Sequence, residues 1–223
     1  MKNLVLSCAL ACASILASIN QSFAQSTKAR WGIKGGLNVT TLGSYNDAAR
    51  GVRNYSYRPG FQAGVVGVLP FVFSDKFDFM PELFYSQKGA KATKSYIVGD
   101  IVSGADYKIS MDYIDVPFLV GFKPRPDLTF TLGPQLSFLV SQKTTVNYGN
   151  TESSSSNTSG YRKVSYGGNL GMAVAINPDF MLGLNYMYDF QHIYSPGVAD
   201  GGYDLHSPER NSGFALTVSY LFN

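Results

Sequence analysis

The chain has 223 residues and a formal net charge of only +3, with 14% aromatic residues and 23 glycines. So small a charge excludes the polyanion partners, such as nucleic acid, that strongly basic proteins bind. Both cysteines, Cys8 and Cys12, lie near the N-terminus, so the rest of the chain has neither a disulfide nor a thiol nucleophile.

Residues 1–24 have the pattern of a secretory signal peptide. Lys2 provides the positive start, an apolar run follows, and Ser22-Phe23-Ala24 places small residues where signal peptidase cuts. We predict cleavage after Ala24, which leaves one domain, residues 25–223. Lipidation of Cys8 or Cys12 is the alternative. No later apolar run is long enough for a transmembrane helix.

Eight segments of strand length follow, each alternating between apolar residues and small or polar ones, which is the period of a β-strand. In the last segment one face carries Phe214, Leu216, Val218, Tyr220 and Phe222. The recurrence of this pattern in every segment favours a closed barrel with lipid outside over a sandwich with an apolar core. The segments are 31–41, 59–73, 77–88, a fourth whose membrane part spans 114–123, 128–141, 164–176, 180–190 and 212–222.

The connections between these segments alternate in length. Three are tight turns, predicted at 74–76, 124–127 and 177–179, and the other four have about 15–21 residues. Outer-membrane barrels have short periplasmic turns and long external loops. A ring also leaves no unpaired strand edge in lipid. We therefore predict an all-β, eight-stranded antiparallel transmembrane β-barrel of OmpA/OmpX-like architecture, with a lumen filled by side chains.

The face opposite the apolar one carries charges of both signs. Charges removed from bulk water persist only with partners, so we expect these residues to pair inside the barrel. The predicted lumen residues are Lys34, Gln62, Asp78, Glu82, Lys88, Asp115, Lys123, Gln135, Asn169, Asn185 and Asp189. Pro81, Pro117 and Pro134 fall inside predicted strands, where each removes a ladder donor, so we expect bulges or breaks in pairing there.

Short motifs occur in a defined order: 32–38 (Gly-Ile-Lys-Gly-Gly-Leu-Asn), 81–89 (Pro-Glu-Leu-Phe-Tyr-Ser-Gln-Lys-Gly), 113–117 (Tyr-Ile-Asp-Val-Pro) and Gly133-Pro134. With the aromatic-rich end, this series resembles the small outer-membrane β-barrel proteins of Bacteroidetes, called PorT-type or "porin family" proteins. The resemblance spans most of the mature chain and implies an eight-stranded barrel. It carries over no residue functions, because the shared motifs look structural and the family is functionally heterogeneous.

The two histidines, His192 and His206, lie in the last predicted loop. Ser195, His192 and Asp189 could form a hydrolase triad near the outer rim. All three come from one strand end, however, whereas a triad usually gathers residues from separate elements. His192, His206 and Asp204 could instead bind a metal, but no ligand spacing recurs. We therefore expect solvated loop residues and predict no catalytic, cofactor-binding or metal site.

Another candidate is a basic and aromatic stretch before the second strand. Its arginines could meet lipopolysaccharide phosphates or a carbohydrate by charge and stacking. A rim at the lipid headgroups accounts for the same composition. The residues are Arg50, Arg53 and Arg58 with Tyr45, Tyr55 and Tyr57.

The prediction is a monomeric, non-enzymatic outer-membrane barrel, surrounded by outer-membrane lipid, whose loops or periplasmic face contact a partner. One alternative is a small passive porin with an ion path between Lys34 and Asp189. A second is a soluble lipocalin-like barrel, whose apolar face would surround a ligand. Against the latter, the opposite face has few of the charges that a soluble exterior needs.

Overall fold

The computed structural model describes residues 29–47, 51–98, 101–148, 151–195 and 209–222. The predicted signal peptide and its cleavage site lie outside these residues. Among them, no helix is long and apolar enough to cross a membrane. The strands are β1 (Arg30–Thr41), β2 (Ser44–Asp47), β3 (Gly51–Phe71), β4 (Ser74–Val98), β5 (Ile101–Arg125), β6 (Leu128–Tyr148), β7 (Thr151–Ser155), β8 (Val164–Ala175), β9 (Phe180–Asp189) and β10 (Ser212–Leu221).

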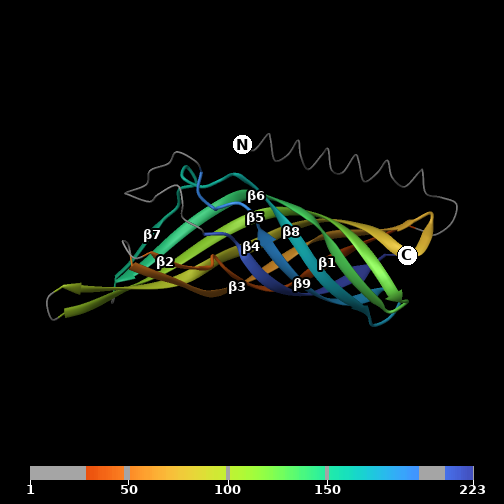
Figure 1. The fold of residues 1–223 in the computed structure, drawn as a ribbon, viewed down its shortest axis with the longest axis horizontal. Helices are drawn as coiled ribbons and strands as arrows, with labels where there is room; N and C mark the ends of the chain where they lie inside the picture. Colours follow the sequence, from red (N-terminus) through yellow and green to blue (C-terminus); the bar gives the residue numbers. More distant parts are fainter. Residues whose placement is uncertain (1–28, 48–50, 99–100, 149–150, 196–208, 223) are drawn as a thin grey trace.

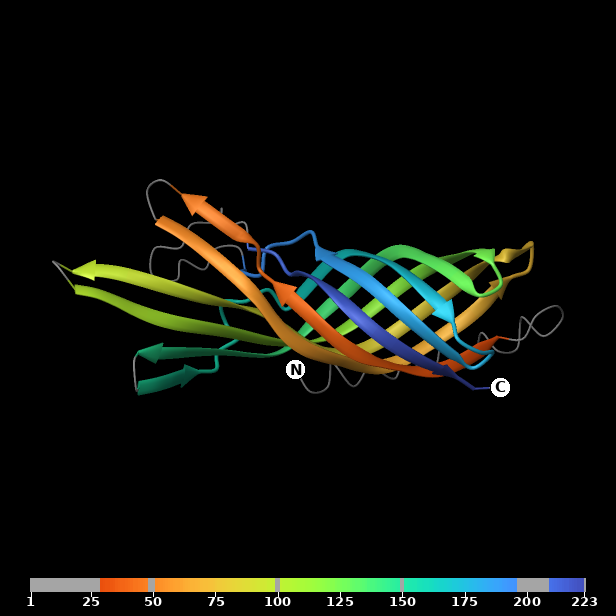
Figure 2. The same cartoon turned by 90° about the horizontal axis from the view of Figure 1, so that it is seen from below.

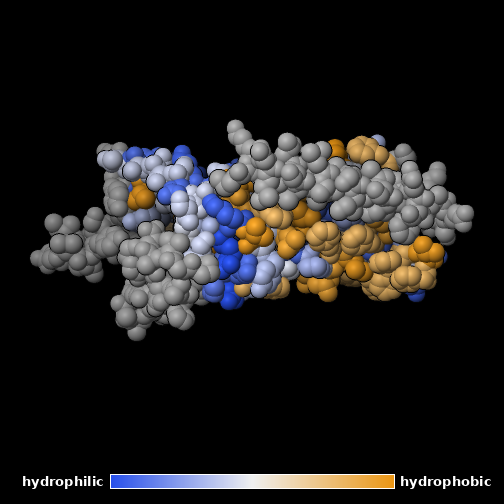
Figure 3. Space-filling view, turned by 90° about the horizontal axis from the view of Figure 1, so that it is seen from above, coloured by the Kyte–Doolittle hydropathy of each residue, from blue (hydrophilic) through white to orange (hydrophobic). Residues whose placement is uncertain are grey.

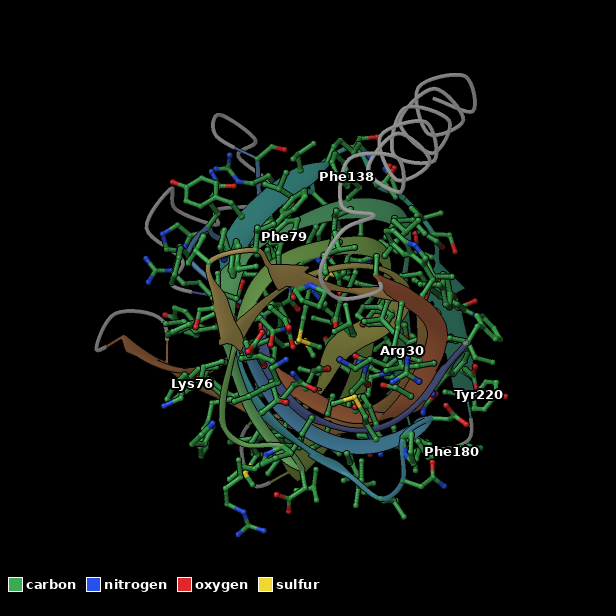
Figure 4. All side chains as sticks on the ribbon, turned by 90° about the vertical axis from the view of Figure 1, so that its right-hand side faces the viewer. Arg30, Lys76, Phe79, Phe138, Phe180 and Tyr220 are labelled. Atoms are coloured by element: carbon green, nitrogen blue, oxygen red, sulfur yellow. The ribbon has the colours of Figure 1, made fainter. Side chains whose placement is uncertain are left out.

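Eight of these strands close into a ring. Their order is β1-β10-β9-β8-β6-β5-β4-β3, and β3 pairs back with β1. The first and last strands close the ring antiparallel, from Gly32 opposite Leu221 to Thr41 opposite Ser212. Figure 1 shows this barrel from the side, and the end-on view in Figure 4 shows the ring with side chains inside it. The predicted eight-stranded antiparallel barrel is confirmed.

The two faces of the barrel strands differ as predicted. Leu37 on β1 is 71% exposed and Leu132 on β6 is 63% exposed, whereas Asp78 and Glu82 inside the ring are 2% and 4% exposed. On the face of the barrel that Figure 3 shows, the apolar side chains form a band, which a hydrophilic strip, here called the hydrophilic collar, borders on one side. This arrangement overturns the lipocalin-like alternative, because the apolar face points outward and the polar face inward. One residue departs from this pattern: in the segment 59–73, alternation places Leu69 on the outer face with Phe61 and Val65, but Leu69 is buried.

Aromatic rings pack together near both edges of this band. Outer-membrane barrels carry a girdle of aromatic residues at each membrane interface, so the two groups mark the boundaries of the membrane-spanning part. The ring centroids are 5.2 Å apart for Phe77–Phe122 and 4.9 Å for Phe180–Tyr220 near the short turns, and 5.7 Å for Phe61–Tyr85 and 5.0 Å for Tyr186–Phe214 near the opposite end.

At the end opposite the short turns, the strands extend much further than predicted. β4 and β5 stay paired from Phe77 opposite Phe122 to Val98 opposite Ile101, although a long loop was expected after Lys88. Likewise, β6 pairs with β7, and β2 pairs with β3. The result is three projecting β-hairpins (Figure 2). Outside lipid neither face of a strand has to be apolar, so the alternation used for the prediction is lost there.

Two of the three predicted short turns are confirmed and one is shifted. The chain turns at Pro126–Asp127 and at 176–179, within or beside the predicted positions. The first turn lies at Val72–Phe73, with Phe71 paired to Ser74, and not at 74–76. Ser74 already belongs to β4 because its pairing with Phe71 closes the hairpin.

Pairing between neighbouring strands is interrupted at all three expected prolines. The bridges at Pro81–Phe118 and at Phe84–Asp115 flank a gap between β4 and β5, and the register resumes unchanged. A similar gap follows Pro117 in the pairing of β5 with β6. On β6 the same gap contains Pro134, because the bridges at Gln135 and Leu132 flank it. The prediction is therefore confirmed there as well, although the ladder between Pro134 and β8 is uninterrupted.

Candidate functional site

The charged residues of the lumen form pairs between strands. Lys34 Nζ on β1 lies 2.8 Å from Glu82 Oε1 on β4, and Lys88 Nζ on β4 lies 2.9 Å from Asp115 Oδ1 on β5. Near the short turns, Lys123 Nζ lies 2.9 Å from Asp78 Oδ1. Every predicted lumen residue is buried except Lys123, whose side chain is 25% exposed. The expected internal pairing is therefore confirmed.

A chain of hydrogen bonds links the Lys88–Asp115 pair to the opposite wall. It crosses the lumen through β4, β6, β8 and β9 and satisfies amide groups that would otherwise be costly to bury. The four hydrogen bonds, each written from donor to acceptor, are Lys88 Nζ to Ser137 Oγ (3.2 Å), Gln135 Nε2 to Ser137 Oγ (3.3 Å), Asn169 Nδ2 to Gln135 Oε1 (3.0 Å) and Asn185 Nδ2 to Asn169 Oδ1 (3.3 Å).

Two apolar clusters enclose this polar middle. The inner cluster, near the short turns, consists of Val66, Met80, Leu119 and Leu221. The outer cluster consists of Leu42, Ala90, Ile109, Met111, Tyr113 and Ile193. Between the inner cluster and the Lys34–Glu82 pair lies a cavity of about 20 Å³, which is enough for a single water molecule. The lumen is thus filled by side chains, as the number of strands predicts.

The segment after β9 covers the outer end of the lumen. Ile193 donates its N–H to Glu209 O at 3.0 Å and accepts a hydrogen bond from Arg162 N at 2.8 Å. Beside it, Tyr161 and Tyr194 form an isolated bridge. The hydroxyl of Tyr55 donates to Glu209 Oε1. These contacts come from segments distant in sequence and carry no local pattern, so sequence reasoning did not identify this closure.

The candidate triad is divided between the lumen and this outer cover. Asp189 is 2% exposed and accepts a hydrogen bond from Asn211 Nδ2 at 3.2 Å inside the barrel. Ser195 donates its backbone N–H to Gly160 O, and the carbonyl of His192 accepts from Arg162 Nε at 3.2 Å. Among the described residues, no group of three or more His, Cys, Asp or Glu side chains is placed to hold a metal ion. His206 and Asp204 lie outside those residues.

The basic and aromatic stretch is not a uniform surface. Arg58 is buried and donates from Nη1 to Lys88 O at 2.9 Å, which corrects the expectation of an exposed rim cation at this position. Tyr57, by contrast, is 57% exposed. Arg50 lies outside the described residues, and the side chains of Arg53 and Tyr45 are not described.

Two of the three projecting hairpins contain a short edge strand, β2 in one and β7 in the other. β7 pairs with β6 from Tyr148 opposite Thr151 to Thr144 opposite Ser155, and all five of its residues are exposed. Within the described part of the chain, β6 is the only strand that pairs with β7, and β3 is the only one that pairs with β2. Among the described strands, none therefore occupies the second edge of β7, whose backbone groups can pair with an added strand.

Comparison with known proteins gives a consistent picture. The model of the outer membrane protein beta-barrel domain matches residues 23–195. The solved structure of neisserial surface protein A is 14% identical, with 88% of this chain and 100% of that chain covered and a TM-score of 0.48. Ail, the attachment invasion locus protein of Yersinia pestis, is also 14% identical, with 88% of this chain and 100% of that chain covered and a TM-score of 0.43. OprG of Pseudomonas aeruginosa is 13% identical, with 87% of this chain and 96% of that chain covered and a TM-score of 0.36.

No curated protein matches the sequence significantly. The family model nevertheless covers more than half of the chain, and the ring of strands is apolar outside and polar inside, so this chain belongs to the outer membrane protein beta-barrel domain family.

Proposed function

We propose that this outer-membrane barrel is a monomeric, non-enzymatic interaction protein that binds a protein partner by strand addition at the free edge of β7. The observation that carries the proposal is the exposed edge strand on a rigid barrel. In strand addition, main-chain hydrogen bonds provide affinity and alternate side chains provide specificity. The edge is short and polar, which limits self-association of the barrel through the same surface.

The direction of the hairpins supports an external partner. All three project from the end opposite the short turns (Figure 2). In outer-membrane barrels the short turns are periplasmic, so the hairpins extend into the external medium. A partner there reaches β7 without entering the membrane.

The test is site-specific photo-cross-linking in intact cells. A photoreactive residue at Ser153 on β7 is expected to give a discrete adduct with a partner protein. The same residue at Asp75, which is exposed at the short-turn end, should not give this adduct. Ser153→Pro and Ser154→Pro each alter the backbone of β7 and should abolish cross-linking from the neighbouring position, whereas Ser156→Pro, just outside the strand, should not. An adduct that survives both strand prolines would refute strand addition.

The passive porin is the competing function, and the filled lumen argues against it. Two apolar clusters and a continuous polar network occupy the interior. Purified protein in a planar bilayer should therefore show no steady single-channel current, and a steady current would favour the porin.

Two further parts of the proposal concern origin and processing. The ordered motifs support a place among the PorT-type barrels of Bacteroidetes. The N-terminal pattern supports export and cleavage after Ala24. The intact mass of the protein from outer membranes should correspond to a chain that begins at Gln25, and a mass that includes residues 1–24 would contradict this.

A further inference from the structure

Three exposed lysines gather on the outward face of the β4–β5–β6 sheet. Lys91 on β4 is directly opposite Lys108 on β5. Lys143 on β6 is opposite Ser110, which lies two residues from Lys108 on the same face of β5. Such spacings place the directly opposed Cβ atoms about 5 Å apart and the diagonal ones about 7–8 Å apart. The neighbours Ala90, Ile109 and Gln142 are buried toward the interior, so the lysines alternate outward.

These lysines differ from those of the lumen in their partners. Lys34, Lys88 and Lys123 each form an ion pair, whereas none of the three outer lysines does so within the part of the chain that is described. Like charges directly opposite each other on a sheet destabilise it, and an anion between them would reverse that effect. The acidic residues of this face of β5, Asp106 and Asp112, lie on either side of the stretch that holds the lysines.

Along the barrel axis, the three lysines lie just beyond the outer edge of the apolar band, where the lipid headgroups begin. Lys143 lies three positions beyond Val140, and Lys108 lies six beyond Ile114. With a rise of about 3.3 Å per residue and a tilt near 40°, these positions are about 8 and 15 Å above the last apolar residues. Lysine side chains can extend from there toward the membrane surface. In Figure 3 a hydrophilic collar borders the apolar band.

We propose that Lys91, Lys108 and Lys143 bind a phosphate group of the outer-leaflet glycolipid, the lipid A part of lipopolysaccharide. Lysine is a compact point charge that suits a phosphate oxygen. The hydrophilic collar beside the lipid favours a lipid-borne phosphate over a free one. This site is separate from the edge of β7 and does not depend on strand addition there.

Native mass spectrometry of the detergent-solubilised full-length mature protein tests the proposal. Titration with bisphosphorylated lipid A should give stoichiometric binding, and dephosphorylated lipid A should bind far more weakly. Each of K91Q, K108Q and K143Q should weaken binding about fivefold, and the triple variant about a hundredfold. K76Q removes an exposed lysine at the short-turn end and should leave the affinity unchanged.

Retention of folding is checked by heat-dependent gel mobility, and K91R/K108R/K143R should bind as the unaltered protein does. Equal binding by the triple glutamine variant, or equal binding of the dephosphorylated lipid, would overturn the proposal. Inorganic phosphate that binds as tightly as lipid A would overturn the assignment to a lipid.

Discussion

At the scale of single residues, Lys88 shows how a charge is kept inside the barrel. Its side chain has no exposed surface, and its ammonium group contacts Asp115 at 2.9 Å and Ser137 at 3.2 Å. Lys88→Met leaves the Asp115 carboxylate buried without its cation, so we expect the free energy of unfolding to fall by about 3–5 kcal/mol. Urea titration in lipid vesicles measures this change.

The matched control is Lys76→Met, at an exposed position, which should change the free energy of unfolding by less than about 0.5 kcal/mol. The double variant Lys88→Met/Asp115→Asn should lose less stability than the sum of the two single variants, because the unpaired charge is removed. Additive losses would show that the ion pair does not stabilise the fold.

Gly89 provides a second prediction at this scale. Its φ of +137° is a conformation that side chains disfavour, and a Cβ would lie 2.0 Å from Ile109 O. Both hydrogen-bonding groups of its backbone also contact Thr40 Oγ1, each at 2.9 Å. Gly89→Ala should therefore cost about 2 kcal/mol or more in the same urea titration.

Gly35 is the control for this substitution, because a Cβ there would meet only Gln62 O at 3.7 Å, an ordinary contact. Gly35→Ala should be near neutral. If the two variants lose equal stability, the strain at Gly89 does not determine the outcome.

At the scale of elements, the membrane part of each strand was predictable and its external part was not. Between Phe214 and Phe222, lipid on one side and the lumen on the other impose strict alternation on the sequence. Past Ala92, β4 has no such constraint, because lipid no longer covers its outer face, while backbone pairing with β5 continues to Val98 opposite Ile101. The sequence pattern therefore ends where the membrane ends, although the hairpin continues.

The external half of the β4–β5 hairpin should be dispensable for folding. Replacing residues 93–106 by Asn-Gly joins Ala92 to Tyr107, which are already opposite each other, through a two-residue turn. We expect folded, heat-modifiable barrels whose free energy of unfolding changes by less than about 1 kcal/mol, because the lumen pairs and both apolar clusters are retained. Failure of this variant to fold would show that the hairpin is required to form the barrel. Lengthening the replacement loop would not restore folding in that case.

At the scale of the whole molecule, alternation predicted which residues line the lumen but not what closes it. The pairs of Lys34 with Glu82 and of Lys88 with Asp115 follow from inward-facing charges of opposite sign. The outer cluster joins Leu42, Ile109 and Ile193, three residues distant in sequence, through a segment that follows β9. Only the folded chain brings them together, so the closed state of the lumen depends on tertiary contacts.

Because the inner and outer clusters lie in series, opening one should not produce a current. Met111→Gly/Ile193→Gly removes side chains that are 0% and 4% exposed from the outer cluster, and Met80→Gly/Leu119→Gly removes side chains that are 5% and 0% exposed from the inner one. Each double variant is expected to remain silent in a planar bilayer, and the combination of all four should give small single-channel currents through the polar middle. A current from the outer double variant alone would show that the inner cluster does not seal the lumen. Silence from the quadruple variant, provided that it folds, would place the barrier in the hydrogen-bonded chain from Lys88 to Asn185.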